Sequence, residues 1–212
     1  MYRHFFKRFL DIVVSLIALP FVLLAVVIMA PIIYINDPGP VFYNATRRGK
    51  NGTTFKMYKF RSMYVNSPDL RNADGTTFNS SNDPRVTKVG RFMRKTSVDE
   101  LPQLLNVLFG RMSLIGPRPT LATVPYEQLT DEQKKRYNVR PGVTGYSQAY
   151  YRNSIGGAEK LKYDCYYVDH VSFVMDIKIL VQTVFSVLGG KNIYVSEEEK
   201  TAEIKIEEPV NK

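Results

Sequence analysis

The longest apolar run of the chain lies near its N-terminus. No charged residue occurs from Ile12 to Ile35. At about 1.5 Å per residue, a helix of this length covers the roughly 30 Å hydrocarbon core of a membrane. Pro20 and Pro31 interrupt the run, and an interior proline removes a backbone hydrogen bond and kinks a helix. The pattern predicts a membrane anchor over residues 1–36 that bends at Pro20 or at Pro31.

Basic residues flank this apolar run on both sides. They are Arg3, Lys7 and Arg8 before it, and Arg47, Arg48, Lys50, Lys56 and Lys59 after it. Positively charged flanks tend to stay in the cytoplasm, so both ends of the segment are expected on the cytoplasmic side. A re-entrant helical hairpin satisfies this condition, and a single transmembrane helix is the alternative.

After the stop at residues 37–40, the pattern changes to short segments separated by turn residues. Val41–Tyr43 and Thr54–Phe60 are predicted to be short strands joined by a turn at Gly49–Gly52. Residues 64–84 are rich in Asn, Asp, Ser and Gly, which predicts a surface loop.

Two helices are predicted in the C-terminal half. Tyr126–Asn138 is polar and carries a capping box at Thr130 and Gln133. Residues 172–188 are largely apolar and end before Gly189, so this helix packs in the core or lies along a membrane interface. We therefore predict a mainly α monotopic membrane protein with a small β-element, an N-terminal re-entrant helical hairpin and interfacial amphipathic helices. The predicted parts are the anchor, a cytoplasmic catalytic domain over 37–190 and a charged C-terminal tail over 191–212.

Charge narrows the class of partner without selecting one. The net charge is +9, and the tail from residue 197 holds six acidic residues and three lysines, so residues 1–196 carry 26 Lys and Arg against 14 Asp and Glu, a net of +12. Such a surface suits nucleic acid, acidic lipid headgroups or phosphorylated small molecules.

Cys165 is the single cysteine, which excludes an internal disulfide, and two histidines argue against a histidine-rich zinc site.

Adjacent carboxylates, Asp99 and Glu100, precede a short helix expected to begin near Leu101, and a Gly-Pro-Arg-Pro turn with Arg118 follows it. A carboxylate can act as a nucleophile or bind a divalent cation, and arginine neutralises phosphate oxygens. Adjacent residues point about 100° apart on a helix, so the two carboxylates can serve different tasks. The alternative is purely structural, since Ser97 and Glu100 have capping-box spacing.

The order of these features closely resembles the small bacterial sugar transferases, which are monotopic phosphoglycosyl transferases acting on polyprenyl phosphate. The resemblance covers roughly residues 5–190. Its matching positions are Asp11, Gly39–Phe42, Lys59–Met63, Asp83–Arg85, Ser97, Asp99–Gln103, Asn106, Met112, Ser113, Gly116–Pro119, Arg140–Gly142, Thr144, Gly145, Asp164 and Tyr167.

The resemblance implies a two-step reaction that initiates glycan assembly. Asp99 would attack the β-phosphate of a UDP-sugar, release UMP and hold the phosphosugar as an aspartyl ester. Polyprenyl phosphate, expected to be undecaprenyl phosphate, would then take up the phosphosugar. Glu100 would bind Mg²⁺. The implied phosphate-binding or substrate-binding residues are Lys59, Arg61, Arg85, Arg118, Arg140 and Asp164.

The expected partners are a UDP-sugar, polyprenyl phosphate and membrane lipid, without nucleic acid, and a homodimer is left open. The expected location is the cytoplasmic face of a bacterial inner membrane. The identity of the sugar and of the glycan pathway is also open. Two rival functions are a sugar-only glycosyl transferase, which would release UDP, and a non-enzymatic membrane-anchored module that binds polyanions. The released nucleotide, UMP or UDP, distinguishes the two enzymatic hypotheses.

Overall fold

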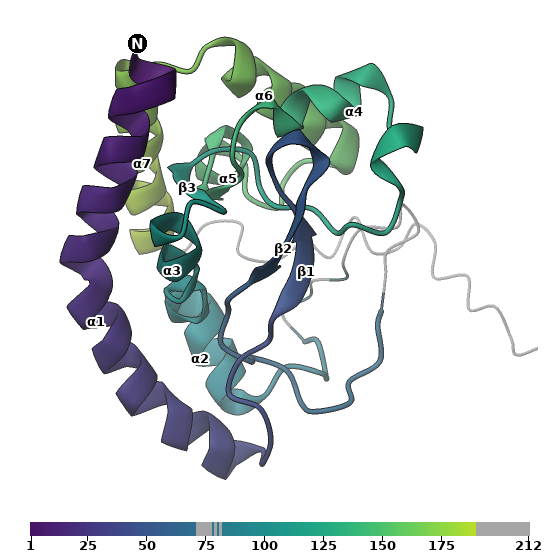
Figure 1. Cartoon of the computed structure of the whole chain (residues 1–212). Coiled ribbons are helices and arrows are strands. Elements are labelled where there is room, and N and C mark those ends of the chain that lie inside the picture. The colour runs from purple at the N-terminus through teal and green to yellow at the C-terminus, as the bar shows by residue number, and fades with distance from the viewer. Residues whose placement is uncertain (71–77, 79, 81, 190–212) are drawn as a thin grey trace, which may run out of the picture.

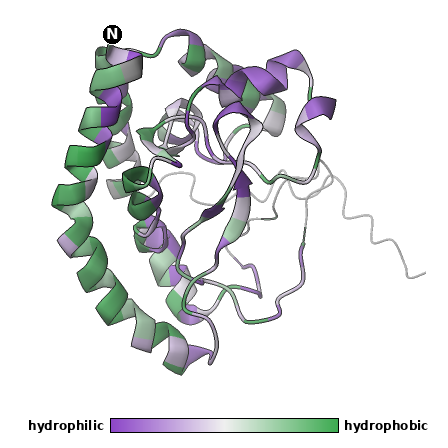
Figure 2. Cartoon of the chain, viewed as in Figure 1, coloured by the Kyte–Doolittle hydropathy of each residue, from purple (hydrophilic) through white to green (hydrophobic). Residues whose placement is uncertain are grey.

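One long helix, α1 (Lys7–Asn36), curves along one side of the molecule and follows a π-helical turn at Tyr2–Phe6. Figure 2 shows that most of its length is apolar. The backbone stays helical through Pro20 and Pro31, so the predicted bend takes the form of a gradual curve (Figure 1). Among the residues that the structure describes, α1 is the one helix long and apolar enough to cross a membrane. The re-entrant path through a bilayer stays a prediction.

Both ends of α1 contact the same folded body. Near its start, the Arg8 guanidinium donates to the carbonyls of Val107 and Leu108 at 2.5 and 2.9 Å. Near its end, Met29 and Ile33 are buried in an apolar cluster that also contains Phe60 and Met93. The helix is therefore attached to the rest of the protein at both ends.

The computed structural model of the chain describes residues 1–70, 78, 80 and 82–189. The predicted tail over 191–212 lies outside them, as do residues 71–77, 79 and 81 of the predicted loop. The described elements after α1 are β1 (Ala45–Arg48), β2 (Thr54–Met57), α2 (Lys88–Thr96), α3 (Gln103–Leu108), β3 (Ser113–Ile115), α4 (Asp131–Lys135), β4 (Gly142–Thr144), α5 (Tyr146–Tyr150), α6 (Gly157–Asp169) and α7 (Phe173–Leu188). The prediction of a mainly helical protein with a small β-element is confirmed.

The two small sheets differ from the predicted pair of strands. β1 and β2 form an antiparallel hairpin around a 3₁₀ turn at Lys50–Gly52, as expected, but β1 begins at Ala45, so the strand predicted at Val41–Tyr43 was wrong. Phe42 forms an isolated bridge with Phe60 instead. β3 and β4 pair in parallel, and the sequence analysis assigned no strand to either segment.

The predictions for the two C-terminal helices are confirmed in part. Ser172 accepts a hydrogen bond from the Met175 N–H at 3.3 Å and caps α7, which confirms the predicted start. The capping box of Thr130 and Gln133 is confirmed as well. The single helix predicted over Tyr126–Asn138 was wrong, because a capping residue has an extended backbone and ends any helix that precedes it. Thr130 therefore separates a 3₁₀ turn at Tyr126–Gln128 from α4.

Candidate active site

The two adjacent carboxylates lie in the connection between α2 and α3. Ser97 ends α2 in a left-handed conformation with φ of 59°, and the next three residues, Val98–Glu100, form a 3₁₀ turn. The Asp99 side chain is 3% exposed and that of Glu100 is 21% exposed. Ser97 makes no side-chain capping bond here, so the capping box that was the structural alternative does not form.

Lys59 binds both carboxylates. Its Nζ lies 2.8 Å from Asp99 Oδ2 and 3.1 Å from Glu100 Oε1. The next residue along the chain explains this position, because the Phe60 N–H donates to the Asp99 carbonyl at 3.0 Å. A backbone hydrogen bond therefore holds the lysine segment against the carboxylate turn.

Asn106 strengthens the same arrangement from α3. Its side-chain oxygen accepts from the Tyr58 N–H, and its side-chain nitrogen donates to the Lys56 carbonyl, each at 2.8 Å. The residue is 2% exposed, and both bonds are part-buried. A buried amide that satisfies a backbone donor and acceptor fixes the spacing between two segments. Asn106 thereby positions the chain that carries Lys59.

Glu100 has a second cationic partner. Arg118 donates to Glu100 Oε1 at 3.3 Å, so Lys59 and Arg118 share the same oxygen. Burial alone raises the pKa of this carboxyl, but the charges of Lys59 and Arg118 and their hydrogen bonds outweigh it and lower the pKa to about 2. Glu100 is consequently ionised throughout the neutral range.

Asp99 is held differently. Its Oδ2 forms the ion pair with Lys59, yet that atom is buried and has no aligned hydrogen bond within the described part of the chain. The Lys59 ammonium is a charged donor 2.8 Å from this oxygen, so Asp99 has one cationic partner where Glu100 has two. A carboxylate oxygen in this state suits nucleophilic attack.

Three of the predicted phosphate ligands have other partners. Arg61 pairs with Asp37 at 2.9 Å, and the buried Arg85 pairs with Asp83 at 2.7 Å. Arg140 Nε donates to the Gly110 carbonyl at 2.9 Å, beyond the C-terminal end of α3, whereas Asp99 precedes its N-terminal end. The structure therefore joins Lys59 and Arg118 to the carboxylates but does not bring these three arginines to them.

Asp164 is connected to the site through a neighbour. It is buried on α6, accepts from Ser147 Oγ at 3.0 Å and pairs with Arg136. Arg136 also donates to the Arg118 carbonyl at 3.3 Å. Burial raises the pKa of Asp164, and the charge of Arg136 opposes that rise. Arg136 therefore links Asp164 to the backbone of Arg118.

The profile of the family described as bacterial sugar transferase matches residues 2–190. The chain belongs to this family. An uncharacterized sugar transferase of Bacillus subtilis is 40% identical over 188 residues, which is 88% of this chain and 89% of that protein. The UDP-glucose:undecaprenyl-phosphate glucose-1-phosphate transferase of Escherichia coli is 40% identical over 195 residues, covering 89% of this chain. The predicted family and the predicted transferase class are confirmed.

Two of the relatives are longer than this sugar transferase. The UDP-N-acetylgalactosamine-undecaprenyl-phosphate N-acetylgalactosaminephosphotransferase of Aeromonas hydrophila is 37% identical over 191 residues, which is 88% of this chain. The chain spans 44% of that protein and 41% of the Escherichia coli enzyme. In each of these relatives, the matched part corresponds to most of this chain.

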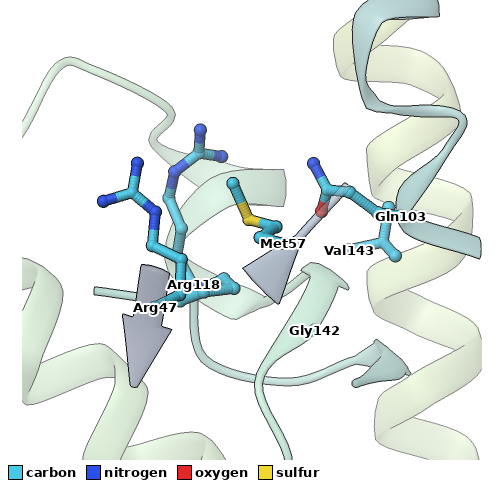
Figure 3. A pocket seen from close by; sticks show the side chains of 7 residues that line it. Arg47, Met57, Gln103, Arg118, Gly142 and Val143 are labelled. Atoms are coloured by element: carbon cyan, nitrogen blue, oxygen red, sulfur yellow. The ribbon is translucent and has the colours of Figure 1, made fainter. Parts of the chain in front are cut away.

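Three further residues of this sugar transferase were not predicted as site residues. Arg152 has a positive φ of 50°. Burial lowers the pKa of its guanidinium, and the negative charge of Glu100 opposes that change. Arg47 and Gln103 line a small hollow together with Arg118 (Figure 3). Gln103 was within reach of prediction, because on a helical path it follows Asp99 by one turn. Arg47 was named only as one of the basic residues after the anchor, and no local pattern marked Arg152.

The donor set limits how a metal ion can bind. Among the described residues, no group of three His, Cys, Asp or Glu side chains can hold a metal ion. Mg²⁺ commonly takes one or two protein carboxylates and completes its shell with water and substrate phosphates. The partly exposed Glu100 beside Asp99 fits that mode of binding and does not fit a site built from protein ligands alone.

Proposed function

We propose that this sugar transferase moves a phosphosugar from a UDP-sugar to polyprenyl phosphate, which we take to be undecaprenyl phosphate, and releases UMP. The observation that carries the proposal is the unequal treatment of the two carboxylates. Asp99 is buried and has Lys59 as its cationic partner, whereas the more exposed Glu100 is held by both Lys59 and Arg118. The substrates in the names of the Escherichia coli and Aeromonas hydrophila relatives support it.

In the first step, an Asp99 carboxylate oxygen forms a bond to the β-phosphorus of the UDP-sugar. The bond from that phosphorus to the bridging oxygen breaks, and the bridging oxygen leaves as part of UMP with both bonding electrons. In the second step, an oxygen of polyprenyl phosphate attacks the same phosphorus, and the Asp99 carboxylate leaves. Both steps are in-line displacements that depend on positioning and charge neutralisation. Lys59 and Arg118 supply the positive charge.

Mg²⁺ is the expected cofactor of this reaction, with Glu100 as its ligand from the protein. When bound, the ion would neutralise charge on the diphosphate. Lys59 and Arg118 are within contact distance of the same carboxylate, so they would have to yield part of that contact. The Glu100 carboxylate is already ionised at neutral pH, as a ligand of Mg²⁺ must be, because its pKa is lowered to about 2.

We further propose that α1 is re-entrant and that the site faces the cytoplasm at the inner membrane. Both ends of α1 pack on one folded body, which a helix leaving the membrane on the far side could not do. The basic flanks of the anchor favour the cytoplasmic side. α7 supports an interfacial position, because Phe173, Val181 and Phe185 are exposed while Ile179 is fully buried.

The decisive experiment supplies the full chain, in nanodiscs with Mg²⁺, with a panel of UDP-sugars and undecaprenyl phosphate. We expect UMP release and, with a UDP-sugar alone, a protein mass increased by one phosphosugar. Asp99→Asn keeps the size of the side chain and should lose both signals. Release of UDP would establish sugar-only transfer instead. A polyanion-binding module predicts no nucleotide release and salt-sensitive binding that survives Asp99→Asn.

A further inference from the structure

A small hollow lies beside the carboxylate pair and is lined by Arg47, Met57, Gln103, Arg118, Pro119, Gly142 and Val143. Figure 3 shows the side chains of Arg47 and Arg118 extending side by side from neighbouring segments. An isolated bridge between Arg47 and Leu121 holds β1 against the chain that follows Pro119. No acidic residue lines the hollow in the part of the chain that the structure describes. Its lining therefore carries two positive charges.

Gln103 adds a polar group to this lining. The residue is 3% exposed, and it contributes to the lining of the hollow. A side-chain amide at the wall of a hollow can donate a hydrogen bond to a bound ligand. Figure 3 shows Gln103 at the side of the hollow opposite the two arginines, with Met57 between them.

The hollow is linked to the carboxylate pair through Arg118. Arg118 lines it and also binds Glu100. Gln103 follows the carboxylates on the same short stretch of chain, at the start of α3. A group bound here lies next to a diphosphate that reacts at Asp99.

We propose that this hollow binds the leaving nucleoside monophosphate, with its phosphate held by Arg47 and Arg118 and with the Gln103 carboxamide as a further donor. This inference rests on the proposed function and adds Arg47 and Gln103 to its substrate-binding residues. Two guanidinium groups favour a phosphate over a neutral sugar, because arginine binds phosphate oxygens through paired charge-assisted hydrogen bonds. The sugar is then left to the other side of the β-phosphorus.

The test measures binding of UMP to the full chain in detergent by isothermal titration calorimetry, with uridine as the probe that lacks the phosphate. We expect Arg47→Gln to weaken UMP binding by about tenfold or more, since it removes one charged phosphate ligand. Arg47→Lys should recover part of the loss. Gln103→Met should weaken binding several-fold, and Gln103→Glu should weaken it further because it brings a negative charge to the phosphate.

Arg111→Gln is the matched control. It removes the same charge from an exposed arginine that does not line the hollow, and we expect UMP affinity within about twofold of wild type. Uridine should bind far more weakly than UMP to wild type, and Arg47→Gln should not change that affinity. Thermal unfolding of each variant reports folding independently, and Gln103→Met tests the hollow if Arg47→Gln does not fold.

Two results would overturn the inference while the proposed function stands. One is UMP release by wild type together with UMP affinities of Arg47→Gln and Gln103→Met equal to that of Arg111→Gln. The other is a wild type that turns over UDP-sugar but does not bind UMP at millimolar concentration. Raised KM for UDP-sugar with unchanged UMP affinity would place the sugar in the hollow. Failure of the proposed function looks different, since no UDP-sugar would then yield UMP.

Discussion

Lys59 Nζ lies 2.8 Å from Asp99 Oδ2 in a protein interior where the aspartate side chain is only 3% exposed. The lysine charge offsets two neighbouring carboxylates that would otherwise repel each other. The contact joins the segment after β2 to the turn before α3. The nucleophile proposed for this sugar transferase, Asp99, therefore has a cationic partner from a distant part of the chain.

Replacing Lys59 should reduce catalysis sharply. Lys59→Met removes the charge that faces both carboxylates, and we expect UMP release to fall roughly 100-fold. Lys59→Arg keeps the charge with a different shape and should restore part of the rate. The control is Lys56→Met on an exposed position of β2, which should stay within about twofold of wild type. Equal losses in the Lys56 and Lys59 variants would contradict a specific role for Lys59.

Glu100 predicts a pH dependence of stability with a definite sign. Its pKa is lowered from 4.5 to about 2, so the folded state prefers the ionised carboxyl. This contribution is fully present above pH 4.5 and is lost as the pH falls toward 2. The difference in unfolding midpoint between wild type and Glu100→Gln should be constant from pH 5 to 8. Below about pH 4.5, the midpoint of wild type should fall relative to that of Glu100→Gln. A change centred above pH 5 would refute the assignment.

Asn106 is expected to act as a positioning residue. Asn106→Ala removes two part-buried hydrogen bonds, to the Tyr58 N–H and the Lys56 carbonyl, and each such bond contributes about 0.5 to 1.5 kcal/mol. Both the melting temperature and UMP release should fall, because Lys59 loses its support. The exposed Asn138 provides the control, and Asn138→Ala should have little effect on either measurement. A stable Asn106→Ala enzyme with normal turnover would show that the backbone bonds alone position Lys59.

A buried charge joins the anchor to α7. Asp176 accepts from Tyr2 Oη at 2.5 Å, Lys7 Nζ at 2.6 Å and Tyr167 Oη at 2.7 Å. Lys7→Met leaves this carboxylate buried without its cation, and breaking a buried pair costs about 3 to 5 kcal/mol. Chemical unfolding in detergent should show that loss. Lys135→Met breaks an exposed pair with Asp169 and should change stability little, so equal effects would argue against the role of burial.

The sequence by itself determined the features that depend on local patterns. The apolar anchor, the capped start of α7, the capping box at Thr130 and the turn between β1 and β2 follow from spacing along a few neighbouring residues. The position of Asp99 and Glu100 ahead of a short helix follows in the same way. The family resemblance added the expected reaction.

Only the tertiary structure decided which cation meets which carboxylate. Lys59, Arg61, Arg85 and Arg140 are equally basic in the sequence, yet Arg61 and Arg85 pair with Asp37 and Asp83, and Arg140 binds a carbonyl beyond α3. The choice depends on which acceptor lies within about 3 Å in the folded chain, and charge alone does not encode that distance. β1 begins at Ala45 because its pairing with Met57 on β2 begins there. The hollow beside Gln103 likewise exists only where β1, α3 and the Arg118 turn come together.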